Sequence, residues 1–486
     1  MNAGKPMSTK KQASANYAFR WDTVDWSLIE EKVSKLQSRI AKAAQRGKRY
    51  LVKKLQYLLS KSYYGRLLAV KRVISNKGNT TAGVDGEIWL TSSSRYRAVL
   101  RLGNKSYRAQ PLKRVYIKKK NGKDRPLGIP TMYDRAMQAL HMLTLDPVAE
   151  VVLDNNSFGF RKYRSTQDAC EYLFKCLSTK QSAKWVLEGD IKGCFDNINH
   201  EWLMKHIPMN KKRLAQFLKS GYMHNNRLYQ NGSGTPQGGI ISPTLANLTL
   251  NGMAQHLREI YWRDTKGRIH RKFNKNQLNF TIYADDFIIT ANNKRVLEEV
   301  KTIITAFFHE RGLELSQEKT VITNIGQGFN FLGWQFRKYC GKLIIKPTND
   351  SFKRIKDKVR EIVKACMGLS QDVLIKRLNP VIRGWCNYHS KVCSKEIFQK
   401  LDSYIYCQLW RWAKRRHSNK SKSWIKSRYF HMISTRDWIF KTDHSKLYFA
   451  SSTPIKRHVL IKMSANPYLV QYNDYYAKRV TCRPSS

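Results

Sequence analysis

Apolar residues recur at helical spacing in the first seventy positions of the chain. Three such stripes occur, at residues 29–40, 51–59 and 67–70. Apolar positions three and four residues apart lie on one face of a helix, so the pattern predicts three helices here. The opposite faces carry lysines and arginines with few acids between them, which favours contact with phosphate groups.

The pattern changes between about residue 81 and residue 340 to short β-like runs with glycines and aromatic clusters. These runs predict a mixed α/β core. Helical spacing returns in three further stripes at 352–362, 373–388 and 397–412, the second of them interrupted at Pro380. We therefore expect a compact helical unit after the core, with a less regular, basic region beyond it.

The net charge of the chain is the most informative of its global properties. The 486 residues include 89 Lys and Arg against 35 Asp and Glu, a net charge of +54. Such an excess attracts polyanions, so nucleic acid is the expected partner and an ordinary small-metabolite enzyme is disfavoured. A disordered tail is excluded as a description of the whole chain, because 42% hydrophobic and 12% aromatic residues suffice for real cores.

Targeting and redox signals are weak. The first twenty residues are basic and lack an apolar segment, so a secretory signal is excluded and a flexible nucleic-acid-binding arm is favoured over a transit peptide. No run of about 18 apolar residues predicts a membrane span. The nine cysteines contain no Cys-x-x-Cys pair, so we expect reduced thiols in an intracellular protein, with a cytoplasmic location favoured over an organelle.

Carboxylates follow apolar runs at two places in the core. The run 185–191 contains Asp190, and Asp285 with Asp286 lies between two β-rich runs. Asp190 alone could be a helix cap. Two anions held at a hairpin tip are costly unless a divalent cation compensates them, so Asp285 and Asp286 favour a metal site. Nucleotidyl transfer with two Mg²⁺ ions is the chemistry that uses such carboxylates.

The segment Tyr283-Ala284-Asp285-Asp286 resembles the Tyr-x-Asp-Asp box of reverse transcriptases, and Asp190 stands where their first catalytic aspartate would be. The resemblance implies an α+β right-hand polymerase fold and an RNA-directed DNA polymerase that uses two Mg²⁺ ions. It implies catalysis by Asp190, Asp285 and Asp286, with the metal held at these residues and at Ile191.

Neighbouring segments are similar to those of group II intron reverse transcriptases. The basic hairpin 112–130 resembles their fingers hairpin, and 234–243 resembles their Pro-Gln-Gly box. The resemblance implies nucleotide binding by five residues: Lys119, Arg125, Phe195, Gln237 and Lys319. Phe195 would crowd a ribose 2′-hydroxyl, although an aromatic residue there could be core, and Lys319 could equally be a surface lysine.

Further blocks extend the likeness to the template path and to the maturase domain. Phe158-Gly159-Phe160-Arg161 resembles the second block of the family, and 383–388 with 409–417 resembles its thumb, or maturase domain X. Tyr388 and Trp410 would be available for stacking, whereas Trp412 is favoured as core. The implied contacts with template, primer or RNA are Arg161, Arg164, Gly238, Arg383, Trp385, Arg411, Lys414, Arg415 and Arg416.

The resemblance divides the chain into five parts without an endonuclease domain. These are a basic arm (1–20), a helical extension (21–80), fingers and palm (81–345), thumb (346–418) and a DNA-binding-like region (419–486). Many relatives continue into a Cys/His-rich HNH nuclease, but Cys482 is the only cysteine after Cys407. The priming 3′ end would then come from a replication fork or from another nuclease.

The expected partners are a group II intron RNA, a target DNA, dNTPs, and an RNA template with its DNA primer. Two alternatives to a polymerase that is also a maturase stay open. One is a non-enzymatic splicing factor, and the other is a polymerase recruited to host defence. The four residues Asp190, Asp285, Asp286 and Gln237 disfavour the first alternative, because a protein that only binds RNA has no chemical need for them.

Overall fold

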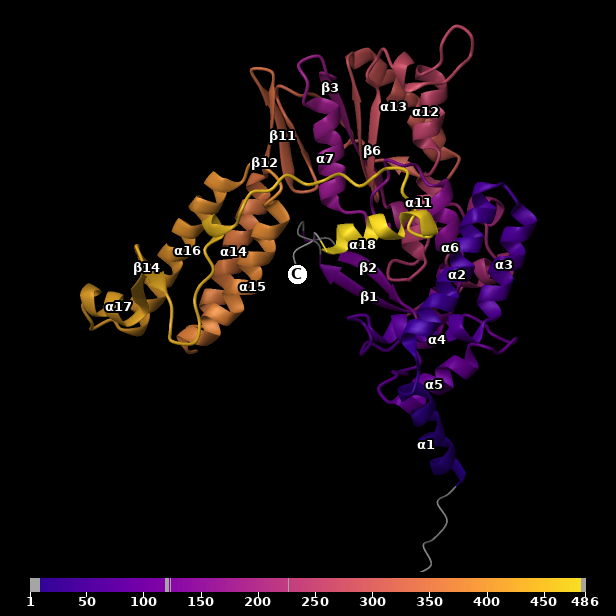
Figure 1. Ribbon diagram of the computed structural model, residues 1–486, viewed down its shortest axis with the longest axis horizontal. Coiled ribbons are helices and arrows are strands. Elements are labelled where there is room, and N and C mark those ends of the chain that lie inside the picture. Colours follow the sequence, from indigo (N-terminus) through magenta and orange to yellow (C-terminus); the bar gives the residue numbers. More distant parts are fainter. Residues whose placement is uncertain (1–8, 119–121, 123, 226, 482–486) are drawn as a thin grey trace, which may run out of the picture.

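The computed structural model describes residues 9–118, 122, 124–225 and 227–481. It has the predicted mixed architecture, with N-terminal helices, a central and a fingers sheet, and a helical thumb (Figure 1).

Five helices form the N-terminal part: α1 (Thr9–Asp22), α2 (Trp26–Gln45), α3 (Arg49–Lys61), α4 (Tyr63–Ile74) and α5 (Ser92–Arg101). The predicted stripes of α2, α3 and α4 are buried, which confirms these helices. The expected flexible arm is wrong for residues 9–20, which belong to α1. This helix packs on α5, where the ring of Tyr17 lies 5.5 Å from that of Tyr96.

The central sheet has the strand order β6-β7-β3-β8, and β9 also pairs with β3. Its strands are β3 (Trp185–Lys192), β6 (Asn279–Tyr283), β7 (Asp286–Ala291), β8 (Glu314–Leu315) and β9 (Val321–Asn324). β3, β6 and β7 confirm the strands predicted around the carboxylates. Val186, Leu187 and Ile289 are completely buried, so this sheet is part of the core.

Helices follow and connect the strands of the central sheet. The longer ones are α6 (Met132–Val152), α7 (Thr166–Leu177), α11 (Ser242–Leu250), α12 (Met253–Tyr261) and α13 (Lys294–His309). Three short helices, α8 (Cys194–Asn197), α9 (His200–His206) and α10 (Lys211–Leu218), follow β3. The α6 helix is the most deeply buried, because α2, α3 and α4 all pack against it.

The fingers sheet has the order β2-β1-β4-β5. It contains β1 (Leu112–Lys118), β2 (Asp124–Ile129), β4 (Tyr222–His224) and β5 (Arg227–Tyr229). The antiparallel pairing of β1 with β2 confirms the predicted basic hairpin.

A three-stranded sheet, β10 (Phe329–Phe331), β11 (Trp334–Tyr339) and β12 (Lys342–Pro347), leads into the thumb. The thumb helices are α14 (Asn349–Ala365), α15 (Gln371–His389) and α16 (Lys395–Arg416). The predicted interruption at Pro380 is wrong, because α15 continues through it. Leu378 and Ile382 on either side are fully buried in the thumb core, and this burial offsets the lost backbone hydrogen bond.

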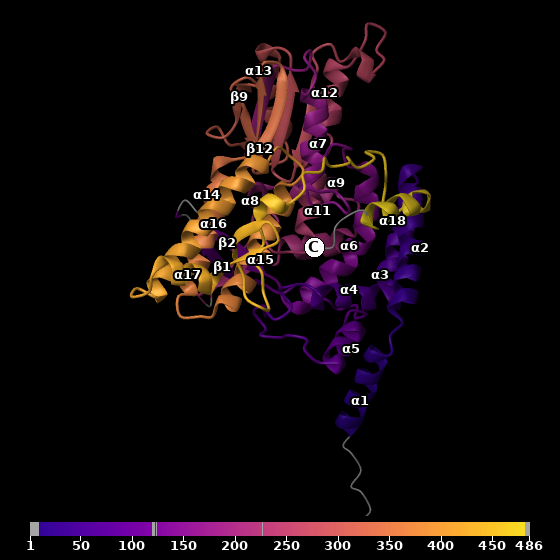
Figure 2. The ribbon, with the colours of Figure 1, turned by 60° about the vertical axis from the view of Figure 1, so that its left-hand side comes forward.

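The structure divides the expected C-terminal region 419–486 into two parts. First, α17 (Lys422–Tyr429), β13 (Phe430–Ile433) and β14 (Arg436–Phe440) share the thumb core. The chain then returns along the palm to α18 (Asn473–Thr481), as the yellow segment in Figures 1 and 2 shows. Arg457 pairs with Glu171 of α7 at 2.7 Å, and the ring of Tyr476 stacks on that of Tyr163.

The described cysteines form no disulfide bond. The eight described cysteines are free thiols, and burial raises the pKa of Cys386 to about 12. Among the residues that the structure describes, no helix combines the length and the apolar character needed to cross a membrane.

Candidate active site

Three carboxylates meet at one end of the central sheet. Asp190 lies directly opposite Asp286 in the antiparallel register of β3 and β7. Asp285 precedes Asp286 in the turn between β6 and β7, where Ala284 adopts a left-handed φ of 57°. Because residues opposite each other project to the same face of a sheet, the Asp190 and Asp286 side chains are neighbours. Segments about one hundred residues apart are therefore brought together as predicted.

Gly159 lies directly against this turn. A Cβ atom at Gly159 would be 2.3 Å from the backbone nitrogen of Ala284. The Gly159 carbonyl accepts a hydrogen bond of 2.8 Å from Asn247 Nδ2, and the Phe158 amide donates to the Ile282 carbonyl at 2.8 Å. The position of the hairpin tip is therefore set by a glycine backbone with no room for a side chain.

The electrostatics of the three carboxylates are mutually repulsive. Asp286 reaches solvent, but the protein packed around it and the charges of Asp285 and Asp190 raise its pKa to about 6. Lys319 Nζ lies 2.9 Å from Asp190 Oδ2, and the hydrogen bond to this carboxylate raises the pKa of Lys319. The lysine partly compensates the negative charge, so the site favours additional positive charge.

The carboxylates fit a divalent cation that is bound jointly with a substrate. Within the described ranges, no three His, Cys, Asp or Glu side chains form a ready-made metal cage. Mg²⁺ at polymerase sites usually binds one or two carboxylates together with substrate phosphates, so a closed cage is not needed. Asp190 and Asp286 supply such a pair, and Ile191 could add only its backbone carbonyl, since its side chain is apolar.

Two of the residues predicted to bind the nucleotide line a pocket of about 340 Å³. Phe195 of α8 and Gln237 line it. Arg125 Nε donates to Gln237 Oε1 at 2.7 Å, and Gln237 Nε2 lies 3.3 Å from a carboxylate oxygen of Asp196. Arg125 and Gln237 are thus brought together with Phe195, whereas Lys119 lies outside the described residues. Burial and the charges of Asp285, Asp196 and Asp190 raise the pKa of Cys194, so Phe195 beside it is near the carboxylates.

Sequence reasoning missed two residues of this pocket, Arg114 and Asp196. The guanidinium carbon of Arg114 lies 3.7 Å from the ring centroid of Tyr222, and its Nε is buried without a partner among the described residues. Strand alternation was the available signal for Arg114, because it shares a face of β1 with Leu112, which also lines the pocket. Asp196 directly follows Phe195, but its contact with Gln237 depends on tertiary structure.

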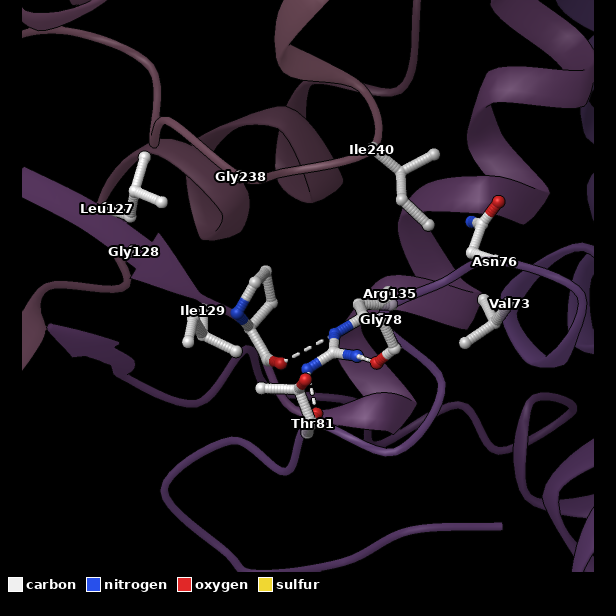
Figure 3. Close-up of a pocket in the computed structure, with 11 residues that line it drawn as sticks. Val73, Asn76, Gly78, Thr81, Leu127, Gly128, Ile129, Arg135, Gly238 and Ile240 are labelled. Carbon is white, nitrogen blue, oxygen red and sulfur yellow. Dashed lines mark hydrogen bonds between the residues drawn. The ribbon is translucent and has the colours of Figure 1, made fainter. Parts of the chain in front are cut away.

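A second pocket, of about 300 Å³, lies between the fingers and the N-terminal extension (Figure 3). Gly238 borders it with φ 115°, and a Cβ there would be 2.6 Å from the Gly128 carbonyl. Arg135 of α6 donates to the carbonyls of Pro130, Gly78 and Thr81. These bonds tie the segment from Gly78 to Thr81, which follows α4, to the end of the fingers hairpin at Pro130, while a nucleic-acid contact at Gly238 stays a prediction.

The predicted template contact of Arg161 is wrong. The Arg161 side chain is only 2% exposed and donates to both carboxylate oxygens of Glu150, at 2.8 and 2.9 Å. Arg164 donates to the carbonyls of Asn155 and Met463, and burial lowers its pKa to about 10. The Arg161 guanidinium is thus used inside the protein, whereas Arg164 is only half-buried and its template contact stays a prediction.

Replacing Arg161 by methionine should destabilise the protein by about 3–5 kcal/mol, because Glu150 would remain buried without its partner. A fall in the thermal unfolding midpoint would report this effect. The double variant Arg161→Met/Glu150→Leu should recover most of the loss. A lower affinity for template at unchanged stability would instead restore the phosphate role.

The thumb residues fall into two groups. Arg383, Arg411, Lys414 and Arg415 are exposed, so their RNA contacts stay predictions. The others are engaged within the protein: Trp385 Nε1 donates to Ser351 Oγ, Tyr388 stacks on Trp334, and Arg416 donates to the carbonyls of Met367 and Leu369. Trp385, Tyr388 and Arg416 are half-buried, so internal contacts engage part of each side chain, and their predicted RNA contacts stay predictions. Trp412 is buried, as predicted.

Three family models match the chain. "Reverse transcriptase (RNA-dependent DNA polymerase)" matches residues 117–336, and "N-terminal domain of reverse transcriptase" matches residues 21–102. "Group II intron, maturase-specific domain" matches residues 352–430.

Two curated relatives are similar over most of their length. Group II intron-encoded protein LtrA of Lactococcus lactis subsp. cremoris is 29% identical, with 72% of each chain covered. Protein YkfC of Escherichia coli (strain K12) is 30% identical, with 62% of this chain and 87% of the relative covered. A solved telomerase from Candida tropicalis is 14% identical to this chain. The match covers 66% of this chain and 61% of the telomerase chain, with a TM-score of 0.38.

Proposed function

Because the chain belongs to the reverse transcriptases encoded by group II introns, we propose that it copies RNA into DNA at Asp190, Asp285 and Asp286. The protein is an RNA-directed DNA polymerase with a maturase domain. The observation that carries the residue assignment is the opposed register of Asp190 and Asp286, with the pocket of Phe195 and Gln237 beside them.

The family uses divalent metal ions, and two Mg²⁺ ions are the proposed cofactors here. The residues that would hold them are Asp190, Asp285 and Asp286, with the backbone carbonyl of Ile191. When bound, the ions stabilise charge on the attacking and leaving oxygens of an in-line displacement. The carboxylates position the primer end and the triphosphate relative to each other, and Lys319 contributes positive charge near the triphosphate.

Arg125, Phe195 and Gln237 are the proposed nucleotide-binding residues. The Phe195 ring excludes a ribose 2′-hydroxyl by steric crowding, and Gln237 offers both a donor and an acceptor to the nucleotide. Arg125 donates to Gln237, and its guanidinium can bind phosphate oxygens in a bidentate manner.

Replacing Arg125 by glutamine should raise the KM for dNTP about tenfold or more, because a charge-assisted hydrogen bond to phosphate is lost. The kcat should fall less than kcat/KM does, since the carboxylates are untouched. Steady-state primer extension at varied dNTP concentration measures both constants, with Arg227→Gln in exposed β5 as the matched control. An unchanged KM would remove Arg125 from the triphosphate site.

Binding of a group II intron RNA is the proposed maturase role, with retrohoming into a target DNA as its consequence. The exposed thumb cations Arg383, Arg411, Lys414 and Arg415 supply charge for RNA phosphates, together with the basic faces of α2 and α3. The catalytic RNA of such a ribonucleoprotein provides the splicing chemistry, and the protein stabilises its fold.

Primer extension by the purified full chain tests the proposed function. The protein should extend a DNA primer on poly(rA) with dTTP and Mg²⁺, and chelation with EDTA should abolish the product. Splicing of the intron that flanks the gene should also be accelerated by the protein. No extension combined with normal splicing would favour a non-enzymatic splicing factor.

A further inference from the structure

A pocket of about 340 Å³ lies away from the polymerase site, between α3, α6 and the loop that joins α9 to α10. None of its lining residues lines the pockets beside Gln237 and Gly238. The polymerase function leaves this pocket unexplained. Its lining residues are Lys53, Gln56, Tyr57, Ser60, His141, Thr144, Met209, Asn210 and Lys211.

The floor of the pocket holds polar groups with spare hydrogen-bonding capacity. His141 is 7% exposed, and in the part of the chain that the structure describes its ring nitrogens have no hydrogen-bond partner. Gln56 Nε2 donates to the carbonyls of Thr144 and Pro208, and over the same residues its Oε1 accepts no hydrogen bond. Neither group is among the fully buried polar atoms of the described residues that lack a partner, so a polar ligand in the pocket can reach both.

His141 offers one donor and one acceptor rather than a charge. Burial, with the nearby charges of Arg213 and Lys61, lowers its pKa to about 4, so the ring is neutral at physiological pH. Together with Gln56 Oε1, the neutral ring presents donor and acceptor groups side by side. This combination matches the edge of a nucleobase, which carries both kinds of group.

The rim of the pocket is cationic and partly aromatic. Lys53 and Lys211 are both exposed, and Lys211 Nζ donates one hydrogen bond of 2.7 Å to the Ile207 carbonyl. Burial together with the charge of Lys53 lowers the pKa of Lys211. Two neighbouring cations favour an anion between them. The Tyr57 ring is 61% exposed beside them, and Met209 adds an apolar wall.

We propose that this pocket binds one unpaired nucleotide of a structured RNA, with the base against His141 and Gln56 and the phosphate between Lys53 and Lys211. Sequence-specific RNA recognition commonly takes unstacked bases out of loops and bulges. A volume of about 340 Å³ is sufficient for a base. The inference rests on the proposed RNA-binding function and adds to it a base-reading site outside the polymerase cleft.

Binding of short labelled oligoribonucleotides tests the proposal. The cleft of the full chain is first filled with unlabelled primer–template, and anisotropy then compares oligomers of A, C or U with an abasic oligomer of equal length. At least one base-bearing oligomer should bind about fivefold or more tightly than the abasic one. A ratio near one in the wild-type protein would overturn the proposal.

Two variants test whether the preference for base-bearing over abasic oligomers arises in this pocket. His141→Phe removes the donor and acceptor of the floor, and Tyr57→Ala removes an exposed wall without disturbing the core. Both should bring the ratio close to one while primer extension on poly(rA) stays at the wild-type level. If Tyr57→Ala leaves the ratio unchanged, the base preference lies elsewhere and the proposal is wrong.

Gln37→Met is the matched control for a buried substitution. Gln37 Nε2 donates to the Leu143 carbonyl of α6 at 2.8 Å, but Gln37 does not line the pocket. This variant should keep the wild-type ratio. Absence of primer extension in the wild-type protein would instead contradict the proposed polymerase function, so the two failures are distinguishable.

Discussion

Asp286→Asn is expected to lower the rate of primer extension by about a thousandfold or more. The substitution keeps the shape of the side chain but removes a charge that would hold the metal ions at the transition state, a contribution of several kcal/mol. Single-turnover extension on poly(rA) measures the loss. Affinity for RNA, measured by filter binding, should remain near the wild-type value because the exposed thumb cations are unchanged.

The thermal stability of Asp286→Asn distinguishes a loss of catalysis from a loss of folding. Burial and the charges of Asp285 and Asp190 raise the pKa of Asp286 to about 6, so its ionised form destabilises the folded state. That cost is present above the folded pKa and disappears as pH falls below the unfolded pKa. Asp286→Asn should therefore unfold at the same temperature as wild type, or higher, at neutral pH.

Asp264→Asn is the matched control for Asp286→Asn. Asp264 closes a surface turn by pairing with Arg268 at 2.8 Å, away from the three carboxylates. This variant should extend primers normally. A parallel loss of RNA binding in Asp286→Asn would contradict the separation of polymerase and maturase roles.

Gly159→Ala is expected to lower primer extension about a hundredfold without a comparable loss of RNA binding. The new methyl group would lie 2.3 Å from the backbone nitrogen of Ala284, so the catalytic turn must move. A displacement of about 1 Å in reacting groups can cost this much. Extension rates at saturating dNTP measure the effect, because the main loss should be in kcat.

Gly368→Ala provides the comparison for Gly159→Ala. A Cβ at Gly368 in the thumb would meet no atom within 4 Å, so its activity should equal that of wild type. Normal extension by Gly159→Ala would show that the carboxylates do not depend on the position of this turn. That outcome would weaken the assignment of Asp285 and Asp286 as catalytic.

Local patterns predicted the elements around the site because the interactions that form them are local. The stripes of α2, α3 and α16 report which faces are buried, and β1 and β2 follow the basic runs of the predicted fingers hairpin. The opposition of Asp190 and Asp286 could be expected from the family resemblance, which carries tertiary information. Pro380 shows the opposite case, because burial of its neighbours outweighs a local helix-breaking preference.

The sequence by itself determined the charge of +54, the class of fold and the three carboxylates. Only the tertiary structure decided which cations face outward. Arg161 carries a guanidinium group suited to binding phosphate, but this group is paired with buried Glu150. Arg164 donates to the carbonyl of Met463, 299 residues later. The same holds for Arg114 and His141, whose pockets are built from several segments. The direction of a side chain depends on neighbours distant in the sequence, and no local pattern contains them.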